Sequence, residues 1–155
     1  MNRSTIANSF TITVLAALAL GTAPAANAQL SCSNATLKGT FAYTSTGFIT
    51  APPSLAGPVA ELGTQTFDAA GNTTATATLS QNGNIAPVSI TGTYSMNADC
   101  TGTMTLQVSI PGIPAFPLHV SFVMDDNGKE FQAMETDAGL VVTRIARKIF
   151  PGTTE

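Results

Sequence analysis

The chain has few of the residues that build common catalytic and metal sites. It contains no tryptophan, two cysteines and a single histidine among 155 residues. Zinc and copper sites draw on clusters of histidine and cysteine, so the sequence predicts no such site. The G-x-S-x-G segment of a serine hydrolase does not occur either. We therefore expect no metal and no cofactor, and we assign no catalytic residue.

Charge is scarce as well. Charged residues make up 10% of the chain, and the six basic residues are outnumbered by nine acidic ones. Nucleic acids and anionic membranes are bound by basic patches. The composition therefore predicts that neither is a partner of this protein.

Residues 1–28 have the features of a secretory signal peptide. Arg3 lies near the start, an apolar run covers residues 10–20, and the small-x-small triplet Ala26-Asn27-Ala28 ends the segment. The run is shorter than the roughly 20 apolar residues that span a bilayer. We expect cleavage after Ala28, a single mature domain over residues 29–155 with a net charge of −4 (five basic against nine acidic residues), and a secreted or periplasmic location.

The two cysteines, Cys32 and Cys100, both belong to the predicted mature chain. Two cysteines in an exported protein most simply form one disulfide. The alternative is a pair of unpaired, buried thiols. The oxidising compartment favours the disulfide.

A β-hairpin is predicted over residues 88–110. Apolar and polar residues alternate up to Met96, a polar turn covers residues 97–102, and the alternation resumes at Met104. Period two on both sides of a turn is typical of two strands with one buried and one exposed face.

Similar patterns elsewhere bring the number of predicted strands to eight, and no amphipathic helix follows the leader. The predicted strands are 37–43, 59–67, 73–80, 88–96, 104–110, 118–124, 130–136 and 140–149. Short strands separated by turn signals at near-regular spacing indicate an all-β sandwich or barrel.

Connectivity favours a single eight-stranded up-and-down antiparallel barrel. In a meander, the proline-rich apolar loops 47–58 and 111–117 share one end, whereas Cys32 and Cys100 share the other. Closure of the barrel also removes the sheet edges that would otherwise pair with another chain.

Three segments resemble small exported bacterial proteins of no assigned function. They are Cys32 followed by Leu37-x-Gly39-x-Phe41-x-Tyr43, the central Gly92-x-Tyr94-x-Met96-x-x-Asp99-Cys100-x-Gly102, and the late Phe122-x-x-Asp125. Those proteins in turn resemble calycin-type barrels, the architecture of lipocalins, avidins and the allene oxide cyclase-like group. The motifs specify turns and a disulfide, so the resemblance implies a fold and transfers no functional residue.

Small residues on the predicted inward face leave room for a ligand, because the lumen of an eight-stranded barrel is either filled by side chains or holds one small molecule. These residues are Gly39, Ala75, Ala77 and Gly92. The orientation of Glu135 is open. If it points inward, it lies beside the hydroxyls of Tyr43 and Tyr94, and burial raises its pKa. The alternative is a packed apolar core with Glu135 outside, near Arg144.

The apolar loops supply the remaining candidate residues. Phe48 and Phe116 belong to a predicted apolar rim that also includes Ile49, Leu55 and Ile113. An exposed apolar rim is typical of a contact surface. The candidate ligand-binding residues are therefore Tyr43, Tyr94, Glu135, Phe48 and Phe116.

Two further segments have simple structural interpretations. His119 alternates out of phase with its apolar neighbours, so we expect it on the outer surface. The acidic segment at residues 125–130 has its glycine at the wrong position for an EF-hand, and it predicts a hairpin turn.

Three functions fit these features. The first is a binding module that holds a small apolar ligand in the barrel lumen. The second is an interaction protein that docks on a protein partner through loops 47–58 and 111–117. The third is a cyclase- or isomerase-like enzyme with a lumenal carboxylic acid, and fold analogy alone supports it.

Overall fold

The structure is a computed structural model that describes residues 31–125 and 128–149. The predicted signal peptide lies outside the described residues, as do Asp126 and Asn127 of the predicted late turn. Among the described residues, no helix is long and apolar enough to cross a membrane.

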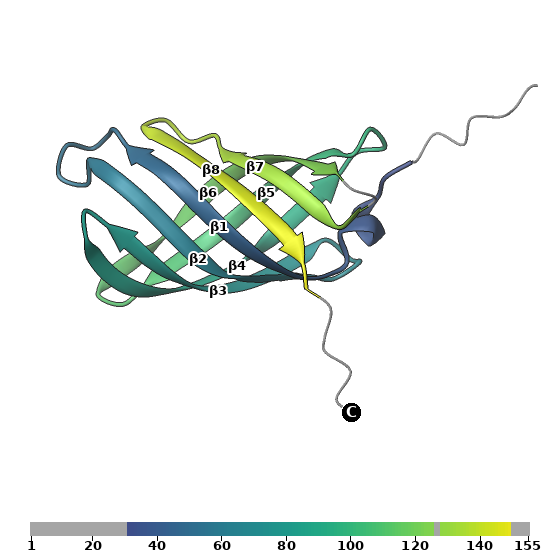
Figure 1. The fold of residues 1–155 in the computed structure, drawn as a ribbon, viewed down its shortest axis with the longest axis horizontal. Coiled ribbons are helices and arrows are strands. Elements are labelled where there is room, and N and C mark those ends of the chain that lie inside the picture. Colours follow the sequence, from purple (N-terminus) through teal and green to yellow (C-terminus); the bar gives the residue numbers. More distant parts are fainter. Residues whose placement is uncertain (1–30, 126–127, 150–155) are drawn as a thin grey trace, which may run out of the picture.

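Eight strands form a closed barrel in which each strand pairs antiparallel with the next and the last pairs with the first (Figure 1). A short 3-10 helix, η1 (Asn34–Leu37), precedes them. The strands are β1 (Gly39–Ile49), β2 (Gly57–Phe67), β3 (Asn72–Gln81), β4 (Asn84–Met96), β5 (Thr101–Ile110), β6 (Ile113–Asp125), β7 (Glu130–Glu135) and β8 (Leu140–Lys148). The predicted up-and-down barrel is confirmed.

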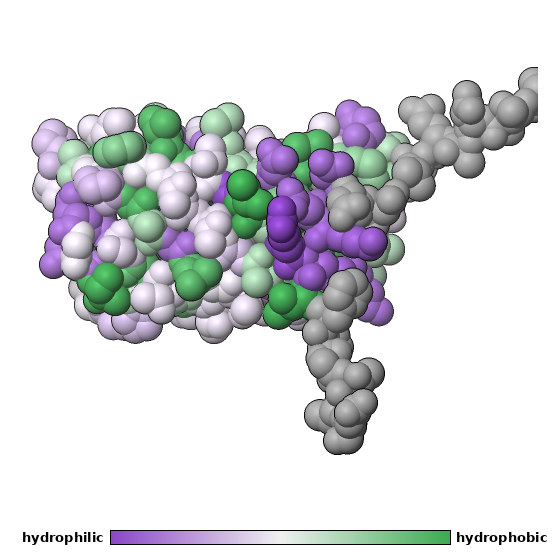
Figure 2. Space-filling model, in the orientation of Figure 1, coloured by the Kyte–Doolittle hydropathy of each residue, from purple (hydrophilic) through white to green (hydrophobic). Residues whose placement is uncertain are grey.

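Alternation along the strands separates the inside of the barrel from the outside. In β5, for example, Met104, Leu106 and Val108 are buried, whereas Thr105 and Gln107 between them are exposed. The outer wall is mostly weakly polar with scattered apolar residues, and strongly hydrophilic residues gather at the end where β8 finishes (Figure 2). The predicted phase of the central hairpin is correct, since Tyr94 is buried.

One half of the barrel interior is filled by aromatic rings. Phe67 lies at the centre, with its ring centroid 5.6 Å from that of Phe41, 5.2 Å from Tyr94 and 5.7 Å from Phe131. Phe122 extends the cluster at 6.0 Å from Phe131. The rings meet mostly edge to face, the arrangement that their quadrupoles favour. This half of the barrel therefore has a packed core.

The same end is closed by η1 and by the disulfide between Cys32 and Cys100, which confirms the predicted pairing. The Tyr94 hydroxyl donates hydrogen bonds to the backbone carbonyls of Asn34 and Asp68. Leu37, the last residue of η1, is fully buried. The first strand was predicted to begin at Leu37. It begins two residues later, because Leu37 belongs to the helix that plugs the barrel.

The proline-rich loops were predicted to be longer than they are. β1 continues to Ile49, β2 begins at Gly57, and β6 begins at Ile113, so the connections shrink to residues 50–56 and 111–112. The prolines of β6 are tolerated because this part of the strand pairs with β5, while the ladder to β7 begins only at Val120. A proline removes one donor, and a strand with one partner can accommodate that loss.

Candidate functional site

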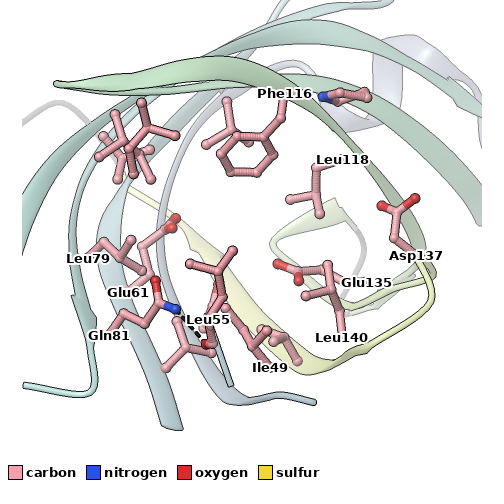
Figure 3. Close-up of a pocket in the computed structure, with 18 of the residues that line it drawn as sticks. Ile49, Leu55, Glu61, Leu79, Gln81, Phe116, Leu118, Glu135, Asp137 and Leu140 are labelled. Atoms are coloured by element: carbon pink, nitrogen blue, oxygen red, sulfur yellow. Dashed lines mark hydrogen bonds between the residues drawn. The ribbon is translucent and has the colours of Figure 1, made fainter. Parts of the chain in front are cut away.

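The other half of the barrel holds a cavity of about 460 Å³. It lies toward the end formed by residues 50–56, 82–83, 111–112 and 136–139. Its wall is mainly aliphatic and includes Ile49, Leu79, Val88, Ile90, Phe116 and Leu140 (Figure 3). In this half the side chains leave space open, whereas the aromatic rings fill the other half.

The small inward residues noted in the sequence do not explain the cavity. A side chain at Gly92 would place its Cβ 2.3 Å from the Thr105 carbonyl oxygen and 2.9 Å from the Leu106 Cα atom. Glycine is needed there because two strands approach closely, and it leaves no room for a ligand. Ala75 lies in the buried core, and Ala77 packs against it. None of the four small residues lines the cavity, so the space in this half of the barrel lies beside other positions.

A polar layer centred on Arg144 lies between the aromatic core and the cavity. Arg144 is 5% exposed, and its Nε donates to Ser45 Oγ at 2.9 Å while Nη1 donates to Gln65 Oε1 at 3.0 Å. Nη2 lies 3.6 Å from Glu61 Oε1. The Tyr43 hydroxyl donates a hydrogen bond to the same glutamate oxygen. Each polar group of Arg144 thus has a partner, as buried charges require.

Glu135 points into the barrel and lines the cavity, which settles the orientation that the sequence left open (Figure 3). Arg144 also lies inside, so the alternative of an outer pair of Glu135 and Arg144 is wrong. The pKa of Glu135 is raised to about 7, mainly by burial; Arg144 lowers it, and the nearby carboxylates of Glu61 and Asp137 raise it. Burial is also the main cause of the raised pKa of Tyr43.

The rim of the cavity is held by hydrogen bonds across the loops. The backbone N–H of His119 donates to Asp137 Oδ2 at 2.6 Å. The ring atom Nδ1 of His119 lies 2.8 Å from the other carboxylate oxygen, Asp137 Oδ1. These bonds lower the Asp137 pKa. On the opposite side, Gln81 Nε2 donates to the Leu55 carbonyl oxygen at 2.7 Å (Figure 3). His119 is exposed, as predicted, and holds the loop after β7.

The structure brings together some of the five candidate residues and separates others. Glu135 and Phe116 line the cavity. Tyr43 lies beneath it and contacts Glu61 through its hydroxyl. Tyr94 lies at the opposite, closed end, where its hydroxyl meets the Asn34 and Asp68 carbonyls. Phe48 is 58% exposed on the outer wall.

Sequence reasoning missed Glu61, and it considered Arg144 only as a neighbour of Glu135 in the alternative with that carboxyl outside the barrel. Both had a usable signal, because each shares its strand parity with apolar residues. Glu61 lies two residues after Val59, and Arg144 lies between Val142 and Ala146 on the inward face. Charged residues are rarely buried, so the inward positions of Glu61 and Arg144 were not predicted.

Within the described ranges, no group of three acidic, histidine or cysteine side chains is placed to hold a metal ion. Comparisons of this chain with known protein families, with curated proteins and with solved structures found no match. The geometry of the cavity is therefore the feature from which a function can be inferred.

Proposed function

We propose that this protein binds a small, mostly apolar molecule in the open half of its barrel. The observation that supports this most directly is the cavity of about 460 Å³ with its mainly aliphatic wall. Ligand sites in proteins typically measure roughly 300 to 1,000 Å³ and combine apolar walls with a few polar groups. Here the polar groups of the lining include Ser45, Glu61 and Glu135.

The cavity is part of the fold and not a packing defect. Protein interiors are close-packed, and voids larger than a water molecule are few. The base of this cavity is fixed by the hydrogen bonds of Arg144, and its rim by the contacts of Asp137 and Gln81. A cavity preformed in this way requires little ordering when a ligand enters, which favours affinity.

Docking of a protein partner through the apolar loops is less well supported. Ile49, Leu55, Ile113 and Phe116 line the cavity, so these side chains shape a mouth. Ligand entry at this end accounts for their position. The lumenal carboxylic acid Glu135 fits binding without any assumption about a reaction.

The location and family of the protein are also part of the proposal. A disulfide between Cys32 and Cys100 is typical of an oxidising compartment, which supports a secreted or periplasmic protein. The closed eight-stranded meander is the architecture that the resemblance to calycin-type barrels implies.

Uptake of Nile red, a neutral fluorescent probe, tests the proposed function. Val88 lines the cavity, whereas the next residue, Ser89, is exposed on the outer wall. We expect the Val88→Trp variant to fill the cavity and to lower the affinity for Nile red at least fivefold. The matched Ser89→Trp variant should stay within twofold of the wild type. Equal affinities in two folded variants, as checked by thermal unfolding, would place the bound probe outside the barrel and contradict the proposal.

A further inference from the structure

We propose that the ligand carries a protonated amine, and that the ammonium group forms an ion pair with the carboxylate of Glu135 inside the cavity. This inference rests on the proposed function and narrows it to one chemical class, small apolar amines.

The charges on the cavity wall are all of one sign. Glu61, Glu135 and Asp137 line the cavity, and the described lining includes no lysine, arginine or histidine. Arg144 lies beneath the lining, and its guanidinium nitrogens are directed to Ser45, Gln65 and Glu61. An anionic ligand, such as a fatty acid, would meet carboxylates here without a cation to pair with.

Two of the three carboxyl groups already have partners. Glu61 accepts the Tyr43 hydroxyl and lies 3.6 Å from Arg144, and Asp137 accepts two contacts from His119. Glu135 differs, because no hydrogen bond from a described residue contributes to its pKa. Burial and neighbouring charges set that pKa. It is the one carboxyl group of the wall whose acceptor sites are left to a ligand.

An ammonium group suits this position better than a neutral donor. A carboxylate held among apolar side chains is unfavourable unless an opposite charge and hydrogen-bond donors reach it. An ammonium supplies both, and charge-assisted hydrogen bonds are about twice as strong as neutral ones. A hydroxyl group can pair with the protonated carboxylic acid, but it brings no charge.

The direction of the pH dependence separates these two cases. The groups that face Glu135 are Tyr43 from β1, Glu61 from β2, Arg144 from β8 and Asp137 from the loop after β7. His119 of β6 contacts Asp137 at the rim. Because the pKa of Glu135 is about 7, its side chain in the ligand-free protein is largely protonated at pH 6 and largely ionised at pH 8. An alkylammonium needs the ionised form, so its affinity should rise about tenfold over that interval. The affinity of an alcohol should stay level or fall.

Three probes with the same apolar cage test the inference: 1-aminoadamantane, 1-adamantanol and adamantane-1-carboxylate. Their affinities are measured by isothermal titration calorimetry on the full mature chain. At pH 8 we expect the amine to bind at least tenfold more tightly than the alcohol, and the carboxylate to bind most weakly. The Glu135→Gln variant should lose the preference for the amine. The control is Glu130→Gln, on the same strand but at the opposite end, where Glu130 contacts Arg147; it should retain the preference.

The other possible outcomes distinguish failure of the amine inference from failure of the proposed function. If the alcohol or the carboxylate binds as tightly as the amine, the inference is overturned and the proposed function stands. The same holds if Nile red binds in the cavity and the amine does not. If the amine is preferred equally by the wild type and by Glu135→Gln, the ion pair is not with Glu135 and the inference is wrong. If neither Nile red nor any of the three probes binds, the proposed function fails and the inference fails with it.

Discussion

The guanidinium carbon of Arg144 lies 4.1 Å from the centre of the Tyr43 ring. The two side chains also converge on the same oxygen of Glu61, through the Tyr43 hydroxyl and through Arg144 Nη2. A cation over an aromatic face is stabilised by the ring quadrupole, most strongly where water is excluded. This pair therefore covers the aromatic core and lies directly beneath the lining of the cavity.

Removal of Arg144 should cost more stability than removal of the pair. In Arg144→Met, Glu61 loses its counter-charge inside the barrel, and we expect a loss of about 3 to 5 kcal/mol in the free energy of unfolding. In the double variant Arg144→Met/Glu61→Gln, residue 61 no longer carries a buried charge, so this variant should recover at least about 1 kcal/mol. Denaturant unfolding measures both. A double variant that is less stable than the single one would show that Glu61 is solvated well enough without Arg144.

The disulfide should make a large contribution to stability, because it joins residues 68 apart in sequence. In the chain-entropy model, a loop of this length stabilises the folded state by about 4 kcal/mol. We expect the double variant Cys32→Ser/Cys100→Ser to lose an amount of this order in denaturant unfolding. A loss below about 1 kcal/mol would contradict the contribution that the chain-entropy model assigns to this loop.

Tyr94 combines two separable contributions. Its ring packs against Phe67, while its hydroxyl satisfies the carbonyls of Asn34 and Asp68. We expect Tyr94→Ala to cost about 3 to 5 kcal/mol, as for other large core aromatics. Tyr94→Phe keeps the ring and should cost about 1 to 2 kcal/mol through the unpaired carbonyls. Equal costs for the two variants in denaturant unfolding would assign the whole effect to the hydroxyl.

The overall fold could be predicted because its signals are local. Strict alternation identifies strands such as β5, and Asn82-Gly83 predicts the turn between β3 and β4. The structure gives these two residues φ angles of 50° and 81°, the left-handed pair that a tight hairpin turn of type I′ requires. The disulfide followed from the number of cysteines and from the ends that a meander brings together.

The site was harder to predict, because it depends on which layer of the barrel is filled. Parity places Glu61 and Arg144 inside, but it does not say that they meet in one layer with Tyr43. Nor does parity reveal that aromatic side chains fill one half while aliphatic ones leave the other half hollow. Those facts follow from strand register, such as the pairing of Ser45 with both Glu61 and Arg144. Register links residues that are far apart in sequence, so single segments do not show it.

Phe48 and Phe116 provide a matched pair for locating the entrance. Phe116 is 38% exposed and lines the cavity, whereas Phe48 is on the outer wall beside Val141. We expect Phe116→Ser to weaken Nile red binding at least threefold, because it removes an apolar contact at the mouth. Phe48→Ser should leave the affinity within twofold. A weaker affinity for Phe48→Ser than for Phe116→Ser would move the binding surface to the outside of the barrel.

Glu135 should make the stability of the free protein depend on pH in an unusual direction. Its pKa is about 7 in the folded state and 4.5 in the unfolded reference. Between these values the folded state binds the proton more tightly, so the contribution of Glu135 to stability is favourable at low pH and is lost as the pH rises toward 7. Paired carboxylates such as Asp137, whose pKa is lowered, act in the opposite direction.

Comparison of the wild type with Glu135→Gln isolates this effect, because the other carboxylates are common to both proteins. At pH 5 the side chain of Glu135 is neutral in the folded state, as glutamine is, so the two proteins should differ by less than about 1 kcal/mol. At pH 8 the variant should be more stable by about 2 kcal/mol, somewhat less than the full shift implies because the carboxyl faces a cavity. Denaturant unfolding at the two pH values measures the difference. A variant that is less stable at pH 8 would mean that the ionised carboxylate has a stabilising partner, and the free acceptor on which amine binding depends would not exist.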